Sequence, residues 1–297
     1  MDKLRNYFYY WLGIVFMALN KIRHMARGYR TPRTFTTRQG DLCINYDFKI
    51  VDGWVDSLNE LTGGRSSFAG KNVLELGPGD ELGAGLILLA LGARKYNAID
   101  INPLVKQVPI GFYEPLLASI RKRVPNADPE LLRKQLKLFY EGGNGQINYI
   151  CDKGFSFSGL KSEKIDIVLS NATFQLLDDV ENTIKEISLL VNSGGCIISG
   201  IDLQTHTRFL RQKDPLNIYR YAEPAYKHLS FRESPNRVRP YEYKGLLEKY
   251  GWEGIVFVPR RSLAQDQLRA AKPYLYGKFK ECGDMDILSG TLFARKK

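Results

Sequence analysis

The sequence predicts an α/β domain built on a mostly parallel sheet and preceded by a helical extension. Two observations support this prediction. From residue 70 onward, short apolar runs alternate with segments of helical periodicity, which is typical of successive strand–helix–strand units. The first apolar run leads directly into a glycine-rich turn at residues 77–79, as strands do where a sheet opens to a ligand. We place the domain at 36–297 and the extension at 1–35.

The first strand–helix–strand unit is the clearest part of the pattern. A buried strand is predicted from Asn72 to Leu76, and a helix follows from about Leu82 to Leu91, ended by Gly92. The second strand runs from Tyr96 to Ile99 and is closed by Asp100.

Residues 101–146 exceed the length of a usual crossover, so we expect an insertion there. It contains a helix whose start is marked by Asp128 as the N-cap and Pro129 at the first position. Strands three and four follow at Ile147 to Ile150 and Ile165 to Leu169.

The remaining elements complete a seven-stranded pattern. A helix is predicted over Val180 to Val191, with a stop signal in the glycine-containing segment 192–195. The fifth strand covers Cys196 to Ile201, and a second insertion occupies 203–251. The last two strands are expected at Ile255 to Val258 and at Ile287 to Ala294.

The turn after the first strand has the composition of a nucleotide-binding turn, because Gly77 and Gly79 let the backbone approach a ligand closely. Three details favour S-adenosylmethionine (SAM) over a dinucleotide. Glu75 precedes the turn, where its carboxylate would attract a methionine amino group. The G-x-G-x-x-G pattern is missing, and Asp80 would repel a pyrophosphate. Asp100 can hold ribose hydroxyls, a feature that dinucleotide enzymes share.

These segments resemble the class I SAM-dependent methyltransferases. The resemblance is carried, in the family's order and spacing, by VLELGPGD (73–80), AID (98–100), Cys151-Asp152 and IDIVLSNATFQLLDD (165–179). It covers about residues 70 to 202 and the closing strand. It implies a Rossmann-like sheet with strand order 3-2-1-4-5-7-6 and SAM over the carboxyl ends of the strands.

The resemblance also implies roles for individual residues. Asp100, with Ile101 beside it, would hold the ribose, and Asp152 would bind the adenine amino group. Ser170 and Asn171 would form the floor beside the methyl group. The family's third glycine position is Glu81 here, which is a departure from the pattern.

Methyl transfer to an oxygen commonly needs a general base. Asp202 ends the fifth strand at the carboxyl edge of the sheet, and His206 follows four residues later. We expect His206 to be the base and Asp202 to orient it or contact the acceptor. The alternative is an exposed loop histidine beside a strand-end acid.

The acceptor is expected to be a small molecule or a glycan, and the insertion at 203–251 is expected to face it. The chain there loosely resembles bacterial methyltransferases of glycan and secondary-metabolite gene clusters. Its arginines are suited to phosphate or carboxylate and its aromatic rings to a sugar, unless this is a solvated basic loop. The residues are Arg208, Arg211, Arg220, Arg237, Arg239, Tyr219, Tyr221 and Phe231.

Some functions are disfavoured. The proline-containing motif of amino-methylating nucleic-acid enzymes is missing at residues 171–174, so a nucleic-acid acceptor is not expected, although the net charge of +11 leaves RNA open. No metal site is expected, since the four cysteines form no C-x-x-C pair. A non-catalytic SAM-binding subunit and an NAD(P)-dependent oxidoreductase are the competing interpretations.

The extension has an apolar run at residues 7–19, too short to span a bilayer comfortably, followed by Lys21, Arg23, Arg27, Arg30 and Arg33. This order favours a cytoplasmic location. It is also typical of a helix that lies in a membrane interface, which predicts peripheral association through residues 7–30. The alternative is a helix packed on the domain or on a partner.

Overall fold

The computed structural model describes residues 2–28, 37–64 and 66–297, so Arg30 and Arg33 lie outside the described residues. Seven strands form one sheet with the order β3-β2-β1-β4-β5-β7-β6. The first five strands pair in parallel, and β7 is antiparallel to both of its neighbours. The predicted order and the mostly parallel sheet are confirmed. The strands are β1 (Asn72–Leu76), β2 (Lys95–Asp100), β3 (Ile147–Cys151), β4 (Ile165–Asn171), β5 (Val191–Asp202), β6 (Trp252–Ser262) and β7 (Ile287–Lys296).

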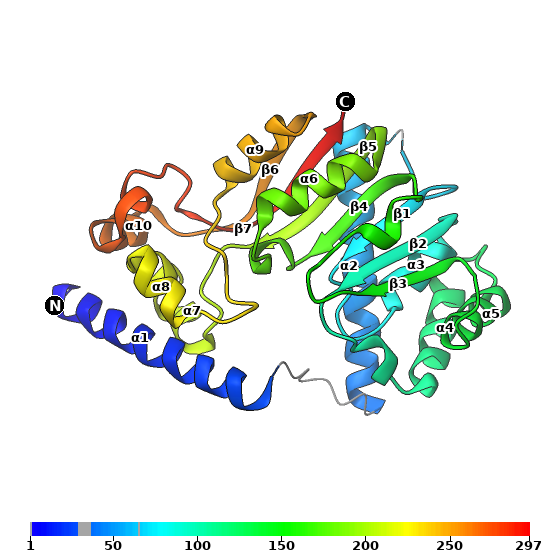
Figure 1. Cartoon of the computed structure of the whole chain (residues 1–297), viewed down its shortest axis with the longest axis horizontal. Helices are drawn as coiled ribbons and strands as arrows, with labels where there is room; N and C mark the ends of the chain where they lie inside the picture. Colours follow the sequence, from blue (N-terminus) through cyan, green and yellow to red (C-terminus); the bar gives the residue numbers. More distant parts are fainter. Residues whose placement is uncertain (1, 29–36, 65) are drawn as a thin grey trace.

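Helices cover both faces of the sheet, which gives a three-layer domain (Figure 1). The alternation of side chains along β1 shows how the layers arise: Val73 packs on one face and Leu74 and Leu76 on the other. One face carries α2 (Thr37–Thr62), α3 (Gly83–Ala90), α4 (Tyr113–Arg123) and α5 (Pro129–Tyr140). The opposite face carries α6 (Val180–Leu190) and α9 (Pro240–Lys249).

Two helix starts have the expected local cause. The Asp128 side chain accepts hydrogen bonds from the backbone N–H groups of Glu130 and Leu131, which confirms the predicted start of α5. Asp179 caps α6 by accepting from the N–H of Asn182 at 2.9 Å. Capped N–H groups stabilise a helix end that would otherwise lack partners.

The sheet differs from the prediction at its centre. Residues 192–195 do not end a helix in a loop but belong to β5, which begins at Val191. Val191 pairs with Ile165, whereas Cys196 pairs with Ile167, so five residues of β5 face two residues of β4. This bulge explains the glycines: Gly194 has a φ of +78°, which L side chains rarely adopt.

The N-terminal extension forms one long helix, α1 (Asp2–Arg27), which lies along the insertion that follows β5 (Figure 1). Tyr10, Ile14 and Met17 of α1 pack on a third apolar cluster that is separate from the two faces of the sheet. The part of the chain that is described contains no helix long and apolar enough to cross a membrane. The other short elements near this cluster are α7 (Arg208–Lys213), the 3₁₀ helix η5 (Asn217–Arg220), α8 (Glu223–Leu229) and α10 (Gln265–Ala271).

Candidate active site

A cavity of about 300 Å³ lies at the carboxyl ends of β1, β2 and β4. This is the edge of an open α/β sheet where ligands bind, and the volume falls at the lower end of the range for small-molecule sites. Five of the nine residues predicted to bind the cofactor line it: Gly77, Gly79, Asp100, Ile101 and Asn171.

The glycine turn forms one side of the cavity. Gly77 and Gly79 have φ values of +68° and +82°, so both hold backbone conformations that favour glycine. A Cβ atom added to Gly77 would overlap the Thr173 side chain, which comes from the loop after β4 and also lines the cavity. The turn therefore needs glycine both for its conformation and for the close approach of the two loops.

Asp100 places a carboxylate at the cavity, where only 8% of the residue is exposed. One carboxylate oxygen accepts from the N–H of Asn102 at 2.9 Å and the other from the N–H of Gly79 at 3.4 Å. Burial raises the pKa of Asp100, while these backbone N–H groups act in the opposite direction. The carboxylate is thereby fixed in orientation and keeps lone pairs for hydroxyl donors.

Backbone strain is concentrated at this cavity. Within the described ranges, four non-glycine residues have positive φ, and Phe155, Ala172 and Glu233 among them line the cavity. Such conformations cost free energy and persist where the surrounding structure requires them, often at functional sites. Glu233 is held there by the Asn102 amide, which donates to its carboxylate at 3.0 Å.

Glu75, predicted to attract the methionine amino group, does not line the cavity. It is 4% exposed and accepts a hydrogen bond from the Tyr96 hydroxyl at 2.6 Å beneath α3. Burial is the main cause that raises the pKa of Glu75 to about 8, with the nearby Glu81 and Asp100 carboxylates contributing. A largely protonated acid at neutral pH attracts a cation poorly, so the predicted role does not follow from this geometry.

The other three predicted cofactor residues also lie off the cavity. Asp80 is buried, and Ser170 is fully buried within β4, because its side chain points into the layer between sheet and helices. Asp152 accepts from the backbone N–H of Ser156 at 3.0 Å and so shapes the loop that carries Gly154 and Phe155 into the cavity. Asp152 itself does not line the cavity.

Glu81, at the family's third glycine position, has a structural role. Its carboxylate accepts from the backbone N–H of Gly83 at the start of α3. An acidic side chain at a helix N-terminus is stabilised by the helix dipole. The departure from the family pattern therefore leaves the turn intact.

Asp202 is bound by residues other than His206. Asp202 forms an ion pair with Arg211 and accepts from the backbone N–H and the side-chain amide of Gln204. Among the described residues no hydrogen bond joins His206 to Asp202, although the Asp202 charge acts on its pKa. His206 instead lines a smaller cavity of about 130 Å³.

The smaller cavity adjoins the first through Glu233, which lines both. Desolvation by the surrounding protein lowers the pKa of His206, the Asp202 carboxylate opposes this, and Arg211 adds to it. This shift favours the neutral imidazole, the form that can accept a proton, although the residue as a whole is exposed.

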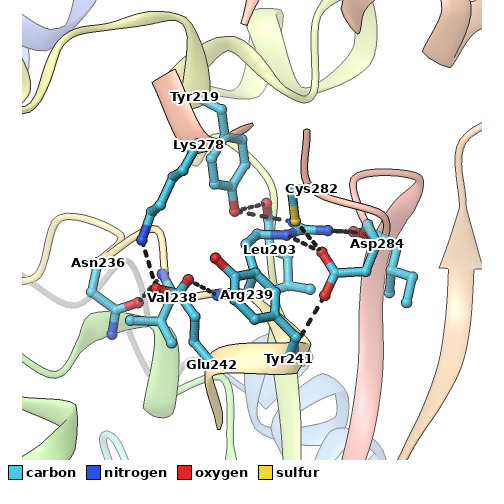
Figure 2. Close-up of polar contacts among 11 residues, drawn as sticks. Leu203, Tyr219, Asn236, Val238, Arg239, Tyr241, Glu242, Lys278, Cys282 and Asp284 are labelled. Carbon is cyan, nitrogen blue, oxygen red and sulfur yellow. Dashed lines mark hydrogen bonds and ion pairs between the residues drawn. The ribbon is translucent and has the colours of Figure 1, made fainter. Parts of the chain in front are cut away.

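The arginines expected to bind an anionic acceptor have structural partners instead. Arg239 is fully buried and donates to the Asp284 carboxylate, the carbonyls of Asp284 and Ile287, and the Tyr219 hydroxyl (Figure 2). Arg237 pairs with Glu223 and donates to two backbone carbonyls. Buried guanidinium groups need such partners, because an unpaired buried charge is costly.

The same correction applies to two more arginines of that set. Arg220 is buried against Asp214 and Asn6, and Arg211 pairs with Asp202. Arg208 is exposed at the start of α7. The expected ring contacts to a sugar are also wrong for Tyr219 and Tyr221, whose hydroxyls donate inside the third cluster, and Phe231 stacks on His24.

The site includes residues that the sequence did not indicate. Phe155, Thr173, Arg232 and Glu233 all line the cavity. They lie in loops after β3 and β4 or in the insertion, where no periodicity or spacing marks them. The one available signal was position: the loop after a parallel strand's carboxyl end is where ligand contacts gather.

Comparison with known proteins finds one family match within the chain. A family model described as a methyltransferase domain matches residues 111–199, from the start of α4 into β5, beyond the glycine turn. No curated protein matches the sequence.

Solved structures similar to this one include several methyltransferases. They include a SAM-dependent methyltransferase from Mesorhizobium loti (14% identity, 83% of this chain and 100% of that chain, TM-score 0.44). Another is phosphoethanolamine N-methyltransferase 2 from Haemonchus contortus (14% identity, 85% and 52%, TM-score 0.44). A third is the CurJ carbon methyltransferase (12% identity, 96% and 66%, TM-score 0.47).

The observed strand order is the one that the resemblance to class I methyltransferases implies, and the glycine turn follows β1 as expected. The family match concerns residues 111–199, less than half of the chain, and shows that this segment is similar to a methyltransferase domain.

Proposed function

We propose that the cavity at the carboxyl ends of β1, β2 and β4 holds SAM, and that the enzyme methylates an oxygen or nitrogen of a small-molecule or glycan acceptor. The observation that carries this proposal is the Asp100 carboxylate, fixed by two backbone N–H groups beside a glycine turn in a ligand-sized cavity. When bound, SAM supplies an electrophilic methyl group on a sulfonium.

The residues present fit this cofactor. Asp100 can accept hydrogen bonds from ribose hydroxyls, and Ile101 and Phe155 offer apolar surface for a planar ring. Gly77 leaves room for the backbone to approach the ligand. Asn171, whose amide donates to the Tyr46 hydroxyl at 3.1 Å, lies on the side of the cavity towards α2.

We assign the acceptor to the side of the cavity formed by Arg232 and Glu233. Arg232 lies 3.8 Å from Asp178 and is partly exposed, so it can also meet an anionic group. With the net charge of +11, this favours an anionic acceptor. His206, in the adjoining cavity, would take the proton that leaves an acceptor hydroxyl as its oxygen bonds to the methyl carbon.

A labelled-methyl assay over glycan, lipid, small-molecule and RNA fractions tests the reaction. We expect label in an anionic small-molecule or glycan fraction. SAM binding without transfer to any fraction would contradict the enzymatic proposal and favour a regulatory subunit.

The base is tested separately once an acceptor is found. The His206→Gln variant should lose about 100-fold or more of kcat while its affinity for SAM stays unchanged, since a general base typically contributes this much. His228→Gln is the matched control, because His228 is exposed on α8 and lines neither cavity. Full turnover by His206→Gln would rule out the base role.

A further inference from the structure

The outer face of α1 is apolar. Large apolar side chains recur on it at spacings of three and four residues, so they share about one third of the helix surface. They are Leu4, Tyr7, Phe8, Trp11, Val15, Leu19, Ile22 and Met25, with exposed fractions from 50% to 79%. We call these eight residues the α1 stripe. A continuous exposed apolar surface of this kind marks an interaction site.

The stripe faces outward because the opposite side of α1 is fixed to the protein. The Asn217 amide donates to the carbonyl of Tyr9 at 2.9 Å, and the Tyr221 hydroxyl donates to the carbonyl of Tyr10 at the same distance. Gly13 lies so close to these two side chains that an added Cβ would overlap both. The rotation of α1 about its axis is therefore set by its contacts with η5.

The charge on α1 has one sign at both edges of the stripe. Lys3, Arg5, Arg23 and Arg27 are exposed, and Asp2 is the only acidic residue between positions 2 and 27. At about 100° per residue, Lys3 falls beside one edge of the stripe and Arg5 and Arg23 fall beside the other, whereas Arg27 lies farther round the helix. Apolar residues flanked by cations are the arrangement of a helix that lies in an anionic membrane surface.

A cationic hollow lies beside the N-terminal half of α1. Five cationic side chains line it, of which Arg220 is paired with Asp214 and Arg211 with Asp202; the others are Arg5, Lys213 and Arg261. Arg5, Lys213 and Arg261 add positive charge beyond these two ion pairs, which favours the phosphate groups of a lipid headgroup layer. The positive charge thus extends from α1 onto the adjacent part of the protein.

We propose that the α1 stripe docks the enzyme on an anionic lipid bilayer, with α1 lying in the plane of the interface. A second copy of the chain is a poorer occupant, because pairing two stripes would bring their cationic edges together. Tyr7 and Trp11 have ring systems with a polar atom, which suit the boundary between headgroups and acyl chains. The docking needs neither the cofactor nor the acceptor.

Trp11 provides a direct readout. It is 63% exposed, whereas Trp54 and Trp252, the other two tryptophans, are 4% and 1% exposed. On adding phosphatidylcholine vesicles that contain phosphatidylglycerol, we expect the emission of the full-length protein to shift to the blue and the protein to sediment with the vesicles. Pure phosphatidylcholine and high salt should weaken both effects. Unshifted emission with no sedimentation would overturn the proposal.

A variant of the α1 stripe distinguishes membrane binding by its apolar side chains from binding by positive charge alone. Phe8→Gln combined with Leu19→Gln should lower the vesicle partition coefficient at least about tenfold, because each apolar side chain lost from the interface costs affinity. Leu189→Gln is the matched control, since Leu189 is 75% exposed on α6 and lies outside the stripe.

Equal partitioning of wild type and the Phe8→Gln/Leu19→Gln variant would overturn the proposal. So would a dimer seen by light scattering without lipid that the same variant converts to a monomer. Circular dichroism of each variant checks that α1 remains folded, and both changed side chains are exposed.

Discussion

Glu75 is a buried carboxyl group outside the cavity, and its protonation affects the stability of the folded protein. Its carboxyl accepts from Tyr96 and lies near Glu81 and Asp100 under α3. Desolvation favours its protonated form, so the folded protein binds a proton that the unfolded chain has lost above pH 4.5.

This gives a pH dependence with a defined sign. Because the folded pKa of Glu75 is raised to about 8, its contribution is fully present below about pH 4.5 and is lost as pH rises through about 8. Relative to Glu75→Gln, the wild type should therefore lose on the order of a few kcal/mol of unfolding free energy across this window. Denaturant titrations of both proteins at several pH values measure it, and parallel curves would contradict the account.

At the cavity, residues at strand ends could be predicted and residues in loops could not. Gly77 and Asp100 follow buried strands whose ends fix them at the sheet edge. Thr173 and Glu233 depend on loop conformations that the sequence pattern does not encode. The prediction that the insertion arginines bind an anionic acceptor failed for a physical reason. A guanidinium that can bind a ligand can equally bind a buried carboxylate such as that of Asp284.

Among the helices, α1 allows the effect of steric overlap at Gly13 on stability to be compared with the effect of helix propensity. Gly13→Ala gains up to about 1 kcal/mol of helix propensity, but its Cβ would overlap Tyr221 and Asn217. Overpacking of this kind costs about 1–3 kcal/mol, so we expect a net loss of stability and faster proteolysis within α1.

Gly53→Ala on α2 is the matched control for this change. Gly53 is also inside a helix, but nothing lies within 4 Å of an added Cβ, so the substitution should stabilise. Thermal unfolding and limited trypsin digestion compare the two variants. Equal stabilisation by both would mean that α1 is not held against η5.

The sheet was predictable from the sequence because its strands are short apolar runs separated by helical periodicity. The start of β5 was not, because Gly194 and Gly195 are typical of a helix end and also of a bulge. The long apolar segment of α1 was visible in the sequence, but its two different faces depend on contacts with η5, some 200 residues away.

At the scale of the whole molecule, the insertion after β5 is in contact with the sheet and with helix α1. The sheet presents a cavity at one edge, the insertion after β5 adds Arg232 and Glu233 to that cavity, and the same insertion packs against α1 (Figure 1). The insertion thus connects the proposed reaction site with the proposed membrane-binding helix.

Isothermal titration of SAM into the wild type and into Asp100→Asn tests the central claim most directly. We expect the wild type to bind and the variant to lose about ten- to hundredfold in affinity, since hydrogen bonds to a charged acceptor contribute about 1.5–3 kcal/mol. Asp56→Asn, an exposed change on α2, should bind as the wild type does. A wild type that does not bind SAM, or equal affinities for wild type and Asp100→Asn, would contradict the assignment of this cavity.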